Sequence, residues 1–182
     1  MLFNEFKNLI KLIHRDLGVP EDYQNEYGLT LQYEEIDLIE IENDIYGRPQ
    51  RAARIIAEPW FQMKAQAENE GVLLNIVSAF RSVERQKEII QRKIDNGGRI
   101  EEILKVCAAP GYSEHHSGRA LDLTTHGCEP LTEEFDETDA FKWLQGNAHL
   151  FSFRLSYPKG NKYGIAYEPW HWALRESWRH NR

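Results

Sequence analysis

Apolar residues near the start of the chain recur with the spacing of a helix. The positions that form this stripe are Leu2, Phe3, Phe6, Leu9, Ile10, Ile13 and Leu17. They predict an amphipathic helix that Gly18 and Pro20 end. Residues 29–46 mix apolar and acidic positions without one clear period, which leaves both a strand and an acidic loop open. Gly47 and Pro49 close that segment.

Helical and β-prone patterns alternate in the middle of the chain. Residues 50–70 have helical spacing, and Gly71 stops the pattern. Residues 72–79 (VLLNIVSA) are apolar and β-prone, which predicts a buried strand. Ser82 can cap a following helix that runs to about Asn96.

Two helices and three strands are predicted in the rest of the chain. Residues 100–106 and 138–149 favour helix, whereas alternation favours strands over 119–124, 151–157 and 165–172. Because strands and helices do not follow a βαβ rhythm, the order predicts an α+β fold. We expect a small central antiparallel sheet flanked by helices.

Length and charge narrow the class of protein. The chain has 182 residues, which suits one domain with a short N-terminal appendage, and a net charge of −7. An acidic chain is a poor candidate for nucleic-acid binding, which needs clustered Lys and Arg. We expect residues 1–46 to form an N-terminal helix and acidic segment of uncertain role. Residues 47–182 would form the main domain.

No segment resembles a membrane span or an export signal. No apolar run reaches the roughly 18 residues that cross a bilayer, and residues 1–17 lack a basic start followed by an uninterrupted apolar stretch. The sequence therefore predicts a cytoplasmic protein, with the periplasm or cell wall open if another route exports it. Cys107 and Cys128 are too few for a disulfide scaffold, so we expect free thiols, with one bridge as the alternative.

Two short segments carry residues that suit a metal. Residues 113–122 read SEHHSGRALD, and residues 168–171 read EPWH. His115, Asp122 and His171 supply two imidazoles and one carboxylate, and three protein ligands with one open position are usual for catalytic zinc. A loop followed by a strand could bring His115 and Asp122 to one ion, whereas His171 must come from a different strand.

Glu168 stands three residues before His171. Catalytic zinc lowers the pKa of a water molecule, and a neighbouring carboxylate can take the proton and later give it to the leaving amine. Taken singly, a loop His or Asp is more often solvated, and a Trp is more often in the core. The joint spacing of the Ser, His, Gly, Ala and Asp positions is improbable by chance in so short a chain.

The motifs resemble those of the zinc D-alanyl-D-alanine carboxypeptidase family, which includes vancomycin-resistance carboxypeptidases and dipeptidases. SEHHSGRALD is similar to S-x-H-x-x-G-x-A-x-D, and residues 167–171 (YEPWH) are similar to the second motif, E-x-W-H. Residues 78–82 (SAFRS) are like the family's S-G-Y-R-S, and Gln86 falls five after Arg81 as in many members. The fold implied is shared with the Hedgehog signalling domain.

The resemblance covers about residues 72–174 and implies roles for the metal-site residues. It implies that one Zn²⁺ per chain is bound in the small central sheet by His115, Asp122 and His171. Glu168 would be the general base and acid.

The same resemblance implies substrate-side residues. Arg81 would stabilise the oxyanion or bind the substrate carboxylate, and Ser113 and Gln86 would form hydrogen bonds with the substrate. His116 stands where many relatives have Gln. We expect His115, not His116, to be the ligand, because only His115 has the family's spacing to Asp122.

These residues imply a zinc peptidase that cleaves peptide bonds next to D-amino acids in peptidoglycan stem peptides. A D,D-carboxypeptidase is the nearest match. L,D-carboxypeptidases, D-Ala-D-Ala dipeptidases and endolysins that cut within the stem share the site. The alternatives of other classes are a zinc-containing binding module without catalysis and a hydrolase that uses Cys107 or Cys128.

Overall fold

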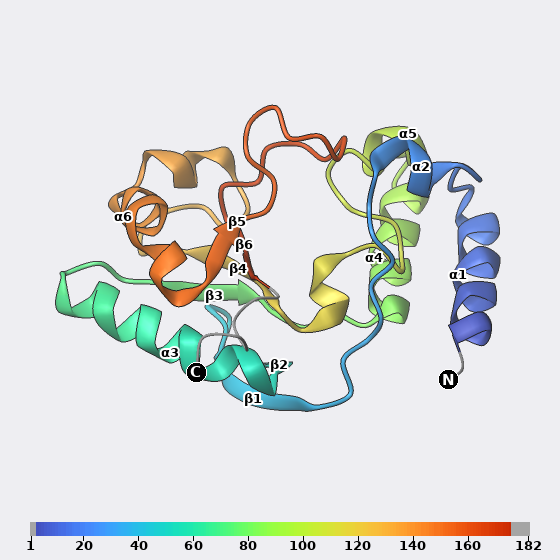
Figure 1. The fold of residues 1–182 in the computed structure, drawn as a ribbon. Coiled ribbons are helices and arrows are strands. Elements are labelled where there is room, and N and C mark those ends of the chain that lie inside the picture. Colours follow the sequence, from blue (N-terminus) through green and yellow to red (C-terminus); the bar gives the residue numbers. More distant parts are fainter. Residues whose placement is uncertain (1–2, 176–182) are drawn as a thin grey trace.

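The computed structural model describes residues 3–175, which form helices around two antiparallel sheets (Figure 1). The helices and strands in chain order are α1 (Phe3–Leu17), α2 (Tyr23–Tyr27), β1 (Leu38–Asn43), β2 (Pro49–Ala53), α3 (Arg54–Asn69), β3 (Asn75–Ser78), α4 (Val83–Asp95), α5 (Ile100–Ile103), β4 (Ala120–Thr124), α6 (Asp139–Asn147), β5 (Phe153–Leu155) and β6 (His171–Leu174). Short 3-10 helices are η1 (Glu114–Ser117), η2 (Glu133–Glu137) and η3 (Ala148–Phe151). This confirms the expected α+β class.

The central sheet has four strands in the order β3-β4-β6-β5, and every neighbouring pair is antiparallel. Its register places Asp122 of β4 opposite Ser78 of β3 on one side and His171 of β6 on the other. Because side chains alternate between the two faces of a strand, these three residues share one face.

The opposite face of this sheet packs onto the larger of two apolar cores. The sheet supplies Ile76, Leu121, Leu123, Phe153 and Trp172. The buried stripe of α3, centred on Trp60 and Met63, and the buried face of α6 cover them. The polar face of the sheet is therefore left for the loops and for chemistry.

A second apolar core joins the N-terminal helix to the loops near the polar face. Helix α1 contributes Phe6, Ile10, Ile13 and Leu17, the stripe expected from the sequence. They pack with Ile90 of α4, and Figure 1 shows α1 and α4 side by side. The division of the chain at residue 46 stays a prediction.

Three sequence expectations need correction. Residues 49–53 are strand β2 rather than the start of a helix, because they pair with β1, and α3 begins at Arg54. The strand expected over 165–172 begins only at His171, because Pro169 has no N–H for a ladder and the chain turns there, with the His171 N–H donating to the Glu168 carbonyl. Strand β5 is likewise shorter than 151–157, since residues 148–151 form η3.

Other expectations are confirmed or resolved. The Ser82 hydroxyl accepts a hydrogen bond from the Arg85 N–H at 3.1 Å and caps α4. Within the undecided segment 29–46, residues 38–43 are strand β1. Cys107 and Cys128 are free thiols, as expected.

The turn between β1 and β2 is organised by one buried carboxylate. Asp44 accepts hydrogen bonds from the backbone N–H groups of Tyr46 (2.9 Å) and Arg48 (3.0 Å). Its other oxygen accepts from Arg48 Nε (2.7 Å) and Gln50 Nε2 (2.9 Å). Gln50 Oε1 in turn accepts from the Ala79 N–H, so the turn is linked to the end of β3. Burial opposes the charge, but these donors hold the pKa of Asp44 below its ordinary value.

We predict that Asp44→Asn lowers the free energy of unfolding by about 1–3 kcal/mol, because a charged acceptor of several hydrogen bonds is lost. Since the folded pKa of Asp44 lies below its unfolded value, the wild-type advantage is complete above about pH 4 and is lost as the pH falls further. Urea denaturation of both proteins between pH 3 and pH 7 measures this. An advantage that grows towards acid would contradict it.

Candidate metal centre and active site

Three buried side chains meet on the polar face of the central sheet. The ligand atoms of His115, Asp122 and His171 all lie within 4.8 Å of one another, and each residue is 3% exposed. His115 comes from η1, Asp122 from β4 and His171 from β6. The two strands are neighbours in register, so the ladder itself sets the Asp122–His171 distance.

A tight turn between η1 and β4 brings His115 back over Asp122. Gly118 ends η1 with a φ of +64°, which favours glycine. A Cβ at this position would lie 2.7 Å from the Ala53 backbone nitrogen. The Ala53 N–H donates to the Gly118 carbonyl at 2.9 Å, so β2 fixes the turn. The glycine of the sequence motif is therefore required by both backbone conformation and space.

In each of the two histidines, one ring nitrogen is hydrogen-bonded to another part of the protein, and the other ring nitrogen faces Asp122. His115 Nδ1 lies 2.6 Å from the Ala79 carbonyl, and His171 Nε2 lies 3.0 Å from the Glu114 carboxylate. Both contacts require the histidine to donate. This leaves His115 Nε2 and His171 Nδ1 as acceptors, 3.1 and 3.0 Å from the Asp122 oxygens. Partners of this kind commonly orient metal-binding histidines.

The donor set fits a cation. An imidazole lone pair and a carboxylate oxygen repel each other at 3 Å unless a proton or a metal ion lies between them. Burial alone would lower the pKa of His171, but the carboxylates of Asp122 and Glu114 raise it to about 10. The cluster therefore attracts positive charge strongly, and two nitrogens with one oxygen suit zinc.

Glu114 is a component of the centre that the sequence interpretation did not identify. Its carboxylate accepts from His171 Nε2, from Ser156 Oγ (2.5 Å) and from Arg154 Nη2 (3.0 Å). Burial opposes ionisation, but these donors lower the pKa of Glu114 to about 2. Only its place between Ser113 and His115 in the motif could have drawn attention to it.

Glu168 lies beside the converging ligand atoms. Its Oε2 is 3.8 Å from His171 Nδ1, and its backbone N–H donates to the Tyr157 carbonyl. Burial raises the pKa of Glu168 to about 7, despite the attraction of His171. A carboxylate with such a pKa is suited to both accepting and releasing a proton near neutrality.

Arg81 follows β3 and reaches the same place from the other side. Its Nη2 lies 3.0 Å from Ser78 Oγ and 3.5 Å from Asp122 Oδ2. Its Nη1 donates to Gln86 Oε1 at 3.1 Å, and Gln86 Nε2 donates to the Ala108 carbonyl at 2.7 Å. Both ends of the Gln86 amide are thus hydrogen-bonded within the protein, the oxygen to Arg81 and the nitrogen to Ala108. A direct contact of Gln86 with substrate stays a prediction.

Ser113 and His116 occupy different positions relative to the cluster. Ser113 is buried and lines the cavity over the ligands, and its proposed contact with substrate stays a prediction. His116 lies 2.6 Å from the Arg81 carbonyl through Nδ1, while its Nε2 accepts from the Gly111 N–H at 3.1 Å. Both ring nitrogens of His116 are bonded to backbone, which agrees with His115 as the metal-facing histidine.

The cavity over the cluster has a volume of about 370 Å³. His115, Asp122, His171, Glu168 and Arg81 all line it, together with residues of the chain after α5 and Trp170. Cys107 also lines it, but burial raises the pKa of this thiol, which makes it a poor nucleophile. The structure therefore unites the Glu168 carboxylate, the Arg81 guanidinium and the three metal-suited residues in one cavity.

A buried His–Asp–His centre with an adjacent carboxylate, set on a small antiparallel sheet, defines a class of zinc peptidase. Residues 50–176 match the family described as VanY: D-alanyl-D-alanine carboxypeptidase. The chain belongs to this family.

Individual relatives agree with this placement. A putative carboxypeptidase, YodJ, of Bacillus subtilis (strain 168) is 33% identical over 180 residues, which is 93% of this chain and 65% of that protein. The solved LdcB LD-carboxypeptidase aligns with a TM-score of 0.70 and 32% identity, over 78% of this chain and 69% of that one. A mutant of the vancomycin-resistance D,D-pentapeptidase VanY, solved with Zn(II), aligns with a TM-score of 0.61 and 25% identity, over 82% and 88% of the two chains.

The chain spans less than two thirds of the length of the YodJ protein. Among residues 3–175, no helix has the length and apolar character needed to cross a membrane.

We predict that Asp122→Asn releases the metal, because the amide carries no charge to balance the cation between the two imidazoles. Zinc measured by atomic emission after dialysis should fall from about one per chain to well below it, with a lower melting temperature because bound metal stabilises the fold. Asp139→Asn, the same change at a residue whose side chain is 91% exposed, is the control and should keep its zinc. Full zinc content in Asp122→Asn would remove Asp122 from the ligand set.

Proposed function

We propose that this chain is a zinc peptidase that removes the terminal D-amino acid from peptidoglycan stem peptides, acting as a D,D-carboxypeptidase. The observation that carries the proposal is the convergence of His115, Asp122 and His171 with Glu168 and Arg81 on one cavity. The likeness to a zinc-bound D,D-pentapeptidase supports it. We further propose that one Zn²⁺ is held per chain.

Each side chain has a task in such a reaction. When bound, zinc acts as a Lewis acid on the carbonyl and lowers the pKa of water. Glu168 Oε2 accepts the proton of the attacking water and then passes it to the leaving amine nitrogen. Burial prepares the Glu168 carboxyl for this by raising its pKa to about 7, so that neither protonation state is strongly favoured near neutral pH.

Arg81 supplies a fixed positive charge to the substrate. Its guanidinium is held by Ser78 and Gln86, so little ordering is left to occur when an anion binds. It can stabilise the tetrahedral oxyanion or pair with the terminal carboxylate of the peptide. The side chain is 18% exposed, so part of it faces the cavity.

L,D-carboxypeptidase activity is the second candidate, because the LdcB LD-carboxypeptidase aligns with a TM-score of 0.70. The deciding experiment measures zinc per chain and then incubates the protein with D-Ala-D-Ala, a pentapeptide stem and a tetrapeptide stem. Loss of D-Ala from the pentapeptide, detected by mass, supports the D,D assignment. Cleavage of the tetrapeptide alone supports the L,D assignment, and cleavage of the dipeptide alone supports a dipeptidase. Zinc-loaded protein that cleaves none of the three contradicts the proposal.

We predict that Glu168→Gln lowers kcat by roughly 10²–10⁴-fold, because the amide cannot carry the proton. Zinc content should be unchanged, since Glu168 lies beside the ligand atoms. Glu133→Gln, the same change at an exposed glutamate, should keep full activity. Full hydrolysis by Glu168→Gln would show that another group moves the proton.

We predict that Arg81→Ala lowers kcat/KM by roughly 10²–10³-fold, because a preorganised partner for negative charge is lost. Its zinc content should match the wild type. Arg85→Ala on α4, where the arginine is half-exposed and pairs with Glu88, is the matched control and should leave kcat/KM unchanged. Unchanged turnover in Arg81→Ala would exclude this residue from the reaction.

A further inference from the structure

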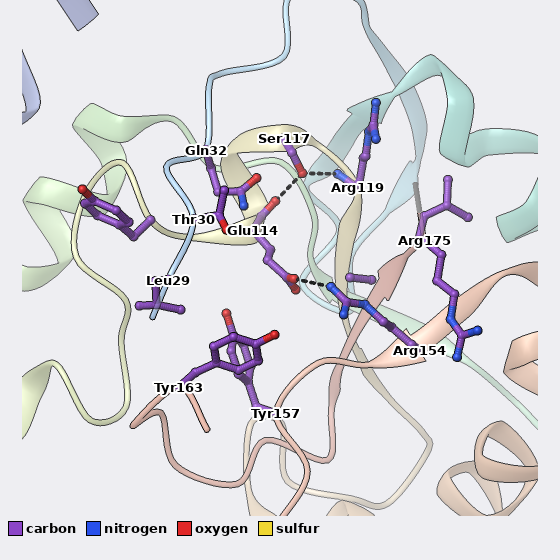
Figure 2. A pocket seen from close by; sticks show the side chains of 13 residues that line it. Leu29, Thr30, Gln32, Glu114, Ser117, Arg119, Arg154, Tyr157, Tyr163 and Arg175 are labelled. Carbon is purple, nitrogen blue, oxygen red and sulfur yellow. Dashed lines mark hydrogen bonds and ion pairs between the residues drawn. The ribbon is translucent and has the colours of Figure 1, made fainter. Parts of the chain in front are cut away.

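A second cavity lies on the same face of the central sheet, next to the metal centre. It has a volume of about 600 Å³, within the range of sites that hold small organic ligands. Figure 2 shows Arg154 pointing from β5 towards Glu114, and the rings of Tyr157 and Tyr163 lying across from Thr30 and Gln32. None of the five residues implicated above in metal binding or catalysis lines this cavity.

The alternation of the sheet explains why a cavity forms here. Ala173 of β6 pairs with Ala120 of β4 and with Arg154 of β5, so they share one row on the polar face. Because the side chains of Ala120 and Ala173 are single methyl groups, they leave space above this part of the sheet. Beyond this row, Arg175 follows β6, and Arg119 precedes β4 opposite Leu174. Both arginines line the cavity.

The charge around this cavity is opposite to that of the whole protein. The chain carries a net charge of −7, yet three arginines and a single carboxylate line the cavity. That carboxylate, Glu114, is already occupied by His171, Ser156 and Arg154. The side chains of Arg119 and Arg175 have no hydrogen bond or ion pair to another residue within 3–175. Two guanidinium groups are therefore left without a carboxylate within the described part of the chain.

The N-terminal segment forms the opposite wall. Leu29, Thr30 and Gln32 line the cavity, and the Gln32 N–H donates to the Gly111 carbonyl at 2.7 Å. This bond ties the wall to the loop that precedes η1. Part of the segment whose role the sequence left open thus encloses a cavity beside the metal centre.

We propose that this cavity binds a carboxylate-bearing organic anion of about the size of a dipeptide. A guanidinium group binds a carboxylate through two parallel hydrogen bonds. Arg119 and Arg175 both line this cavity, and Figure 2 shows their side chains pointing in different directions, so each offers a separate contact for a carboxylate. The rings of Tyr112, Tyr157 and Tyr163 supply apolar surface for the body of the ligand. The site is distinct from the proposed catalytic cavity, although Tyr157 lines both.

The test titrates the ¹⁵N-labelled full chain with Ala-Glu, with its uncharged counterpart Ala-Gln-amide, and with glucuronic acid. The two acids distinguish a peptide source from a sugar-acid source of the same carboxylate. We expect one of them to shift the backbone amides of residues 29–32, 119 and 173–175, with the amide counterpart at least tenfold weaker. The double variant Arg119→Gln/Arg175→Gln should weaken that acid at least tenfold, and Arg99→Gln, a remote exposed arginine, should not.

Arg81→Ala separates this site from the catalytic cavity, since a carboxylate could also bind Arg81. Binding that survives in Arg81→Ala and is lost in the Arg119/Arg175 double variant supports the proposal. Binding that is lost in Arg81→Ala but survives in the double variant overturns it, as does the absence of any shift with either acid. These results are independent of hydrolysis, so the second site and the proposed function can fail separately. Circular dichroism should show unchanged melting for the double variant, because neither arginine is buried.

Discussion

The requirement for a cation at Asp122 is the constraint on which the functional face of this protein depends. Two imidazole nitrogens are held 3.0 and 3.1 Å from the oxygens of one buried carboxylate. In a region almost without water, three acceptors at such distances are unfavourable unless a positive charge joins them. Strand pairing brings two of them together, and the Gly118 turn brings the third. The local fold is therefore arranged around a charge that it must bind.

The hydrogen-bond acceptors of His115 and His171 are as important for the geometry of the centre as the ligands themselves. The Ala79 carbonyl and the Glu114 carboxylate each accept a hydrogen bond from one imidazole N–H and so decide which nitrogen faces Asp122. The Ala79 N–H also donates to Gln50 Oε1, which links Ala79 to the Asp44 turn. The β1–β2 hairpin, far from the cavity in sequence, thus helps to fix the backbone that orients His115.

The sequence revealed the centre because its chemistry is concentrated in short motifs. His115 and Asp122 are seven residues apart, and Glu168 and His171 are three apart, so each pair stands out within one short motif. That the two pairs form one site is what the resemblance to the zinc carboxypeptidase family implies. Glu114 could not be recognised this way, since its role arises from contacts with Arg154 and Ser156 about forty residues later. The second cavity was equally hidden, because its arginines come from three different strands or strand ends and line one cavity only through the register of the sheet.

The mistaken secondary-structure predictions have the same origin in long-range contacts. Residues 50–53 have a helical pattern that continues into α3, but pairing with β1 draws them into a strand. Residues 165–170 look like a strand, but the chain must turn at Pro169 for Glu168 to face the cavity while His171 joins the sheet. In both places tertiary pairing outweighs local propensity.

Glu114 separates two regions of opposite charge on one face of the sheet. On one side, Asp122 supplies a negative charge that suits a metal ion. On the other, three arginines gather positive charge that suits an anion. The Glu114 carboxylate accepts from His171 and from Arg154 at once, so it supplies an acceptor to the imidazole and a counter-charge to the guanidinium. A neutral residue at this position would leave the imidazole without its acceptor and the guanidinium without its counter-charge. One ionised carboxylate thus links the histidine of the metal centre to the arginine of the second cavity.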